Sequence, residues 1–303
     1  MFASRTIGLA LSFLLIGASV ADAATDAFTC APGTVRTIET TLAGVPALVR
    51  IPRSITKPPI ILWHGFGSPD SERALMDALP LDEVPAVKVY LGLPLFGARL
   101  PAGGNAELGR RQATDLASLL FEPSVMGAAN ELSSVLKALE AHGCVKAHDA
   151  IGLFGFSAGG AAVLFALAEA QVPVSAVVTL NASTGLTASV NAFERAMKQP
   201  FAWTDRARQL ARQSDAPGRA QDIAAGQPLP SLLIIHGNED AMLTPQVART
   251  LNDALAPFYQ RAKAGQRLQL ELVPGMTHTW ADAEHIEPLR KSIAAWFDRY
   301  LSA

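Results

Sequence analysis

The sequence has little of several features that define specialised protein classes. Its 303 residues include only two cysteines, aromatic side chains make up 7%, and 25 lysines and arginines nearly balance 27 acidic residues. Two cysteines exclude a small scaffold held by many disulfides, and a formal charge of −2 gives no support for nucleic-acid binding. Beyond the N-terminus, no stretch approaches the ~20 uninterrupted apolar residues that cross a bilayer. Because 50% of the residues are hydrophobic, the composition predicts a globular fold with a sizeable core.

Residues 1–23 have the three-part pattern of a secretory signal peptide. One arginine is followed by a short apolar run over residues 7–20, and residues 21–23 are Ala-Asp-Ala, with small residues where a signal peptidase reads. A serine and a glycine interrupt the run, which favours cleavage over an uncleaved membrane anchor. We therefore expect an exported protein, periplasmic or secreted, with no stable membrane anchor after cleavage and a single domain over residues 24–303.

Export determines which oxidation state we expect for the two cysteines. In an oxidising compartment an even pair predicts a disulfide, here between Cys30 and Cys144. Closing a loop of this length contributes about 3–5 kcal/mol to stability. Two unpaired, buried cysteines are the alternative.

Strands and helices alternate along the mature chain. Short apolar runs predict strands buried on both faces, and a pair of β-prone runs around Ala43 and Gly44 predicts a hairpin. The predicted strands cover residues 34–41, 45–51, 60–63, 86–91, 150–156, 174–180, 232–236 and 267–273. The predicted helices cover residues 106–121, 123–142, 161–169 after a small-residue turn at 157–160, 245–261 and 283–301. This alternation indicates an α/β fold in which helices cover both faces of a mostly parallel sheet.

One region departs from the alternation. Residues 184–228 are richer in Gln, Arg, Asp and Gly and contain no strand signal. We interpret them as a helical excursion, either a small cap over the functional site or a surface insertion.

The first motif is a G-x-S-x-G sequence at residues 155–159, between an apolar strand and an apolar helix. Such a strand-to-helix turn raises the hydroxyl of Ser157 above the sheet, where a serine can act as a nucleophile. The N–H of Ala158 and the positive end of the helix then face any oxyanion that forms.

The second motif is His-Gly-Phe-Gly at residues 64–67, directly after a predicted strand. The glycines permit a tight turn that turns the N–H of Phe66 toward the same oxyanion. His64 lies at the strand end, inside the loop, so we interpret it as a structural histidine rather than a base.

Two further loops carry an acid and a base. Residues 236–240, His-Gly-Asn-Glu-Asp, follow one late strand and offer Glu239 or Asp240, because a carboxylate there can orient a histidine. His278 follows the next strand. Of the six histidines, it is the only one that lies in a loop after a strand and also comes after both the serine and the acid in the chain. It can accept and return the serine proton.

The chain order serine, acid, histidine on alternating strands and helices resembles the α/β-hydrolase superfamily, and within it the bacterial carboxylesterases of the dienelactone-hydrolase-like group. The resemblance extends from the His-Gly-Phe-Gly loop to the last helix. It implies Ser157 as nucleophile, Asp240 as acid, His278 as base, and the N–H groups of Phe66 and Ala158 as oxyanion donors. Dienelactone hydrolase itself has cysteine where this chain has serine, which sets that specific activity aside.

The resemblance implies a serine carboxylesterase that cleaves a small-molecule ester through an acyl-enzyme and needs no cofactor. Histidine, cysteine and carboxylate residues show no metal-ligand spacing either. A peptidase of the prolyl-oligopeptidase type, a polyester depolymerase and a catalytically silent binding protein are the alternatives. A peptidase needs an acidic anchor for the substrate amine, and we interpret Asp70, Glu72 and residues 82–83 as solvated charges.

A substrate pocket needs apolar side chains near these loops. The candidates either line such a pocket or belong to the ordinary core; they are Leu95, Phe96, Trp203, Met242 and Trp280.

Overall fold

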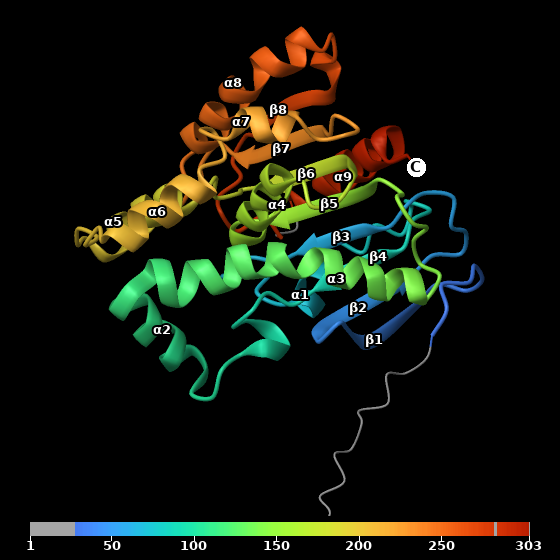
Figure 1. Ribbon diagram of the computed structural model, residues 1–303, viewed down its shortest axis with the longest axis horizontal. Coiled ribbons are helices and arrows are strands. Elements are labelled where there is room, and N and C mark those ends of the chain that lie inside the picture. The colour runs from blue at the N-terminus through green and yellow to red at the C-terminus, as the bar shows by residue number, and fades with distance from the viewer. Residues whose placement is uncertain (1–27, 282–283, 303) are drawn as a thin grey trace, which may run out of the picture.

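A computed structural model describes residues 28–281 and 284–302, and the predicted signal peptide at residues 1–23 lies outside these ranges. Its centre is an eight-stranded sheet with the order β1-β2-β4-β3-β5-β6-β7-β8 (Figure 1). The strands are β1 Arg36–Leu42, β2 Val45–Ile51, β3 Ile60–Trp63, β4 Lys88–Leu91, β5 Ile151–Phe156, β6 Val174–Leu180, β7 Ser231–Gly237 and β8 Leu268–Val273.

The strand directions confirm the predicted mostly parallel sheet. Strands β1 and β2 form the predicted hairpin, and β2 also runs antiparallel to β4. All other neighbours, from β4 through β3 and β5 to β8, are parallel. In a parallel sheet the carboxyl ends of the strands share one edge, so the loops that follow β3, β5, β7 and β8 meet there.

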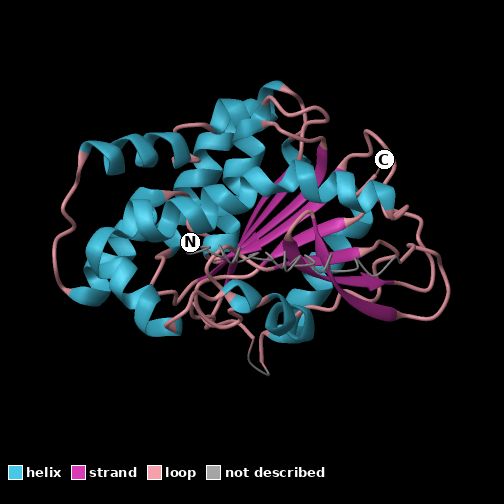
Figure 2. Ribbon diagram, turned by 60° about the horizontal axis from the view of Figure 1, so that its bottom comes forward, coloured by secondary structure: helices cyan, strands magenta, loops and turns pink. Residues whose placement is uncertain are grey.

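Helices cover both faces of the sheet, as Figure 2 shows. The helices are α1 Glu72–Ala78, α2 Gly104–Asp115, α3 Gly127–Ala141, α4 Ala158–Glu169, α5 Leu186–Met197, α6 Asp205–Ser214, α7 Ala220–Ala224, α8 Pro245–Arg261 and α9 Ile286–Tyr300. Short 3₁₀ turns are η1 Gly97–Arg99 and η3 Gly265–Arg267, and η2 Leu116–Met126 is π-helical.

The core has two layers because alternate strand residues face opposite ways. Ile61 and Leu153 face a large cluster formed with η2, α3, α4 and α8. Ile60 and Phe154, one position away in β3 and β5, face a smaller cluster formed with α1 and α9. The inner strands β3 to β7 are therefore buried on both faces, as their continuous apolar runs predict, whereas the edge strands β1 and β8 are partly exposed.

Two helix boundaries differ from the prediction. Residues 106–121 and 123–142 were expected as separate helices, but the break lies at Asp115, which has an extended backbone (φ −161°, ψ 90°) and caps η2 by accepting a hydrogen bond from the Ser118 N–H, and η2 continues directly into α3. Pro123 lies inside η2. A proline removes a backbone donor and crowds the preceding turn, and the local π-helical widening accommodates it without ending the helix. The last helix, expected from residue 283, begins at Ile286, with His285 as its N-cap.

The excursion over residues 184–228 is helical, as predicted, and contains α5, α6 and α7. Figure 1 shows α5 and α6 projecting beyond the carboxyl edge of the sheet, on the same side as α2. Arg195 of α5 donates a hydrogen bond from Nη2 to the carbonyl oxygen of Met242 at 2.6 Å. The excursion therefore contacts the loop that follows β7.

The described N-terminal segment is fastened to the end of α3. Cys30 and Cys144 form the predicted disulfide. Beside it, Phe28 stacks on His142 with ring centroids 4.0 Å apart, and the Cys30 N–H donates to the His142 carbonyl oxygen at 3.1 Å. In the part of the chain that the structure covers, no helix has the length and apolar character needed to span a membrane.

Candidate active site

Ser157 occupies a sharp turn between β5 and α4. Its backbone has φ 52° and ψ −115°, a strained conformation for a residue other than glycine. Two residues later, Gly159 packs so closely on β3 that a Cβ atom would lie 2.4 Å from the carbonyl oxygen of His64. The glycines of the motif thus let the turn pack against the neighbouring strand while the serine faces the carboxyl edge.

The His-Gly-Phe-Gly loop lies against this turn. A Cβ atom on Gly65 would be 2.9 Å from the Ser157 Cβ, so only glycine permits this approach. Neither the N–H of Phe66 nor that of Ala158 has an acceptor among the described residues. Two free backbone donors beside a serine hydroxyl are the arrangement that stabilises an oxyanion.

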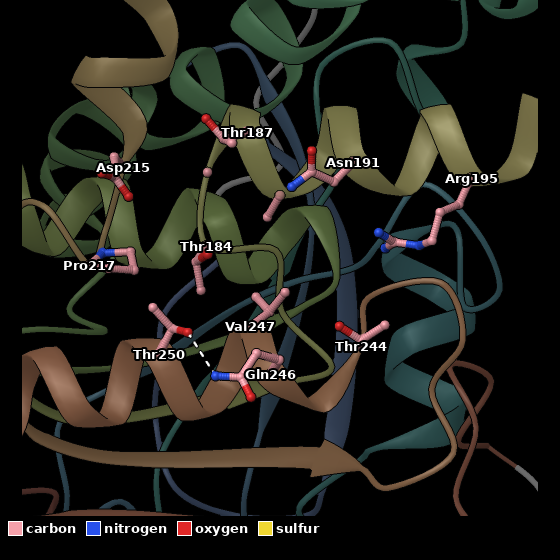
Figure 3. Close-up of a pocket in the computed structure, with 12 residues that line it drawn as sticks. Thr184, Thr187, Asn191, Arg195, Asp215, Pro217, Thr244, Gln246, Val247 and Thr250 are labelled. Carbon is pink, nitrogen blue, oxygen red and sulfur yellow. Dashed lines mark hydrogen bonds between the residues drawn. The ribbon is translucent and has the colours of Figure 1, made fainter. Parts of the chain in front are cut away.

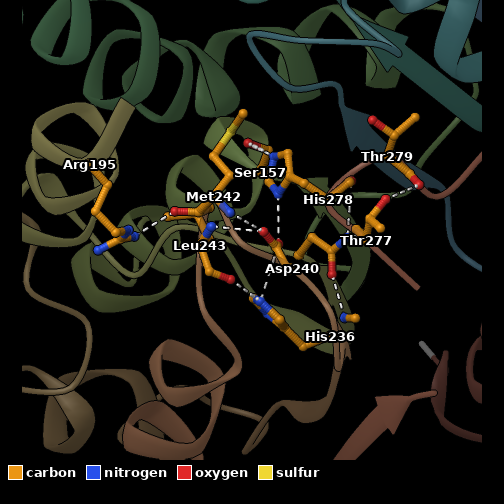
Figure 4. Close-up of polar contacts among 11 residues, drawn as sticks. Ser157, Arg195, His236, Asp240, Met242, Leu243, Thr277, His278 and Thr279 are labelled. Carbon is orange, nitrogen blue, oxygen red and sulfur yellow. Dashed lines mark hydrogen bonds and ion pairs between the residues drawn. The ribbon is translucent and has the colours of Figure 1, made fainter. Parts of the chain in front are cut away.

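His278 bridges the serine and the acid, as Figure 4 shows. Its Nε2 lies 3.1 Å from the Ser157 hydroxyl oxygen, and its Nδ1 lies 2.7 Å from Oδ2 of Asp240. Both distances are within hydrogen-bond range. Glu239, the alternative acid, is exposed to solvent, whereas Asp240 is buried. The structure thus brings together the three residues that the sequence singles out, and this histidine can accept a proton from the serine.

The buried Asp240 carboxylate has several donors. Its Oδ1 accepts hydrogen bonds from the backbone N–H groups of Met242 and Leu243, both at 2.8 Å. Burial alone would raise the pKa of Asp240, but His236, His278 and the Leu243 N–H favour the charged form and hold its pKa well below the ordinary value. A charged Asp240 fixes the His278 tautomer and stabilises the imidazolium form.

His236, at the end of β7, contacts the loop that carries Asp240. Its Nε2 lies 2.6 Å from the carbonyl oxygen of Leu243 and 3.4 Å from Oδ2 of Asp240, so its N–H faces both acceptors. His236 belongs to the predicted acid motif, but no role was predicted for it. Its position at the end of a buried strand, four residues before the acid, is the only sequence signal for this contact.

His64 is a structural histidine, as expected. It is fully buried, its Nδ1 donates to the carbonyl oxygen of Gly65 at 2.7 Å, and its Nε2 accepts from the Leu93 N–H at 3.1 Å. Burial lowers the pKa of His64 to about 4, so the ring is neutral at neutral pH. The ring joins the loop after β3 to the loop after β4.

A pocket of about 500 Å³ opens beside Phe66. Phe66 and Phe96 stack in its wall with ring centroids 4.5 Å apart. The rest of the lining comes from the loops after β3 and β4 and from α2 and η2, namely Asp70, Ser71, Gly97, Leu100, Asn105, Leu108, Gly109, Gln112 and Leu120. The sequence does not reveal this wall, because none of the residues of α2 is buried and its pattern is that of a surface helix.

Of the five predicted pocket residues, Phe96 alone is in this lining. Leu95 and Trp203 are half-buried and pack against the core, and Met242 is 53% exposed beside Asp240. Trp280, the fifth candidate, is fully buried and packs edge-to-face on Phe156, 5.9 Å between centroids, so it occupies the core position that was the alternative for it. The sequence left both places open because side-chain direction in a loop follows no periodicity that the sequence reveals.

A second pocket, of about 410 Å³, lies between α5 and the first turns of α8 (Figure 3). Thr187, Asn191 and Arg195 recur every four residues along α5 and face it, opposite Gln246 and Thr250 of α8. Because Arg195 also contacts the Met242 carbonyl, this polar pocket borders the acid loop. Within residues 28–281 and 284–302, no group of three His, Cys, Asp or Glu side chains could hold a metal ion.

Solved structures share this fold across most of the chain. The Thermus thermophilus protein TT1662 aligns with a TM-score of 0.65 and 22% identity over 89% of this chain and 99% of its own. A dienelactone hydrolase from Anabaena variabilis aligns with a TM-score of 0.51 and 17% identity over 88% of this chain and 99% of its own. No curated protein matches the sequence.

A puromycin-hydrolyzing peptidase from Mycobacterium tuberculosis aligns with a TM-score of 0.60 and 16% identity over 88% of this chain, but this chain spans only 39% of the peptidase. At these identities the likeness establishes the fold, which is that of the α/β hydrolases. A sequence profile of the prolyl oligopeptidase family matches residues 127–303, more than half of the chain. That range contains Ser157, Asp240 and His278 on the elements just described, and the chain therefore belongs to the prolyl oligopeptidase family of α/β-hydrolase serine hydrolases.

Proposed function

We propose that this protein is a carboxylesterase that uses Ser157 as nucleophile, His278 as general base and acid, and Asp240 as the orienting carboxylate. The hydrogen-bonded chain from the Ser157 hydroxyl through His278 to Asp240, on a strained strand-to-helix turn, carries the proposal. His278 takes the serine proton as the oxygen attacks the ester carbonyl, and the N–H groups of Phe66 and Ala158 meet the developing negative charge. The alcohol leaves with that proton, and water activated by His278 releases the acid.

Two observations favour esters as substrates. The lining of the pocket beside Phe66 is partly polar, but its aromatic and aliphatic part, which includes Phe66, Phe96 and Leu108, suits an apolar acyl or alcohol group. The chain also matches nearly the whole length of the dienelactone hydrolase, whose lactone substrate class is a cyclic ester, but only 39% of the peptidase.

Hydrolysis of p-nitrophenyl esters of increasing acyl length, beside a Ser157→Ala variant, tests the proposal. We expect turnover by the wild-type protein and a loss of at least ~10³-fold in the variant, because the hydroxyl is the attacking group. Unchanged turnover in Ser157→Ala would rule out the serine mechanism, and no turnover of any ester by the wild-type protein would rule out the esterase.

A change in the pocket wall tests which group of the ester binds there. Leu108→Trp narrows the pocket from α2, and Leu108→Ala is the matched control that widens it. If the acyl chain occupies this pocket, Leu108→Trp lowers kcat/KM for long acyl chains and spares the acetate. An equal effect at every chain length would assign the pocket to the alcohol instead.

A peptidase is the second candidate, supported by the family match and by Asp70, an exposed carboxylate that lines the pocket. A carboxylate at this place offers a partner for a substrate amine. Aminoacyl p-nitroanilides with free and with acetylated amines distinguish the two functions. A peptidase would prefer the free amine and lose the preference in Asp70→Asn, whereas no anilide cleavage at all would reject this candidate.

We also propose that the protein is exported, as the N-terminal sequence predicts. The Cys30–Cys144 disulfide supports export, because such bonds persist mainly in oxidising compartments. N-terminal sequencing of the mature protein should start near residue 24; a mature chain that still begins at Met1 would contradict cleavage.

A further inference from the structure

One buried asparagine contacts the loops that carry both predicted partners of Ser157. Asn181 directly follows β6 and has no exposed surface. Its backbone is left-handed, with φ 44°, a conformation that asparagine adopts more readily than most residues. The turn it makes keeps its side chain at the carboxyl edge, between the end of β7 and the loop after β8.

Both the oxygen and the nitrogen of the Asn181 side-chain amide form hydrogen bonds. Its Oδ1 accepts a hydrogen bond from the Gly237 N–H at 2.7 Å, at the end of β7, where the acid loop begins. Its Nδ2 donates to the carbonyl oxygens of Thr277 and His278 at 2.9 and 3.1 Å. One side chain thus joins the start of the acid loop to the main chain of the histidine.

The same segment also holds the serine. The Ser157 N–H donates to the carbonyl oxygen of Leu180, and the Ser183 N–H donates to the carbonyl oxygen of Ser157, both at 3.1 Å. Residues 180–183 therefore touch all three segments whose side chains form the hydrogen-bonded chain in Figure 4. Nothing in the hydrolase mechanism requires an asparagine here, yet its contacts converge on that geometry.

We propose that Asn181 is a positioning residue, which fixes the main chain of His278 so that its imidazole stays between Ser157 and Asp240. The inference rests on the proposed function of these three residues. The neighbouring Thr277 and Thr279 are exposed, so at this part of the loop the hydrogen bonds from Asn181 Nδ2 hold the main chain on its inward side. Without the Nδ2 donor, two carbonyl oxygens lose their partner and the loop gains freedom to shift.

Two variants separate the amide from the backbone turn. Asn181→Gly keeps the left-handed turn and removes the side chain, whereas Asn181→Asp keeps the shape and the Oδ1 acceptor but lacks the Nδ2 donor. We expect kcat to fall about 30–100-fold in both, because a displacement near 1 Å costs rates of that order. KM should change by less than about threefold, since Asn181 does not touch the pocket.

Thr179→Val is the matched control. Thr179 lies two residues earlier in β6, is equally buried, and its hydroxyl has no hydrogen-bond partner among the residues that the structure describes. Valine has nearly the same shape, so the variant should keep wild-type kcat. All rates are measured well below each variant's melting temperature and per active site, counted by labelling Ser157 with a fluorophosphonate, so that unfolded protein does not contribute.

The labelling rate separates the two proposals. If a fluorophosphonate fails to label the wild-type protein, the proposed function itself fails. If the wild type is labelled and both Asn181 variants keep kcat and labelling rate within twofold of it, Asn181 does not position His278. An equal loss in Thr179→Val would also overturn the inference, because the effect would then belong to β6 in general.

Discussion

The fold opposes the protonation of His64. This residue has no exposed surface, and its Nε2 must remain unprotonated to accept the Leu93 N–H. Burial lowers its pKa to about 4 in the folded state, against an ordinary value of 6.5 in the unfolded chain. Between these two values the unfolded state binds more protons than the folded state, so stability must rise with pH there.

From this shift we predict that the free energy of unfolding falls by about 3 kcal/mol as the pH falls from 6.5 to 4, because His64 is then protonated in the unfolded chain but not in the folded protein. The contribution is fully present above pH 6.5 and levels off below pH 4. Urea unfolding at several pH values measures it. His64→Gln keeps an amide donor and an acceptor but does not titrate, so its free energy of unfolding should change less between pH 4 and 6.5. The same pH dependence in the variant as in the wild type would show that other groups cause it.

At the scale of elements, the environment of a glycine decides what its helix tolerates. Gly109 lies in α2, where a Cβ atom would meet no atom within 4 Å. Gly159 lies in the first turn of α4, where a Cβ atom would come within 2.4 Å of the His64 carbonyl oxygen and 2.5 Å of that of Trp63. Both helices have a glycine at these positions, but only α4 requires one.

The same substitution should therefore have opposite effects in the two helices. Gly109→Ala should raise the free energy of unfolding by about 0.5–1 kcal/mol, because alanine restricts the unfolded chain and favours helix. Gly159→Ala should lower it by about 1–3 kcal/mol, because β3 and α4 must move apart. Chemical denaturation measures both, and a Gly159→Ala protein as stable as wild type would contradict the close packing of this turn.

At the scale of the whole molecule, the disulfide fastens the N-terminal segment to the edge of the sheet far from the active site. Cys30 and Cys144 are separated by 114 residues in sequence. Cys144 follows α3 and precedes β5, at the amino ends of the parallel strands, whereas Ser157 lies at their carboxyl ends. The bond is thus placed to affect stability without touching the reacting groups.

Replacing both cysteines, Cys30→Ala with Cys144→Ala, should lower the free energy of unfolding by about 3–5 kcal/mol, because the unfolded chain regains the freedom of a long loop. Ester turnover per folded molecule should stay unchanged. Phe28→Ala, which removes the stacking on His142 but keeps the bond, is the control for local packing. A loss of turnover with no loss of stability would place the disulfide in the active-site geometry instead.

Much of this organisation is encoded locally in the sequence. Strands such as 60–63 and 174–180 are continuous apolar runs, so their burial on both faces could be predicted without any tertiary contact. The turn at Ser157 and the loops of Asp240 and His278 each follow such a strand. Because parallel strands bring their carboxyl ends to one edge, the sequence alone indicates that these three residues meet.

Only the tertiary structure decided the distances and the supporting contacts. Asn181 and His278 are 97 residues apart, and no local pattern links them, because their hydrogen bond depends on how β6 and the loop after β8 pack. The same reason explains why Phe96 lines the pocket while Trp280 is buried in the core. Hydrophobic periodicity is a property of neighbouring residues, so it determined the elements and their order, whereas side-chain directions in loops arise from contacts between segments that the folded chain alone brings together.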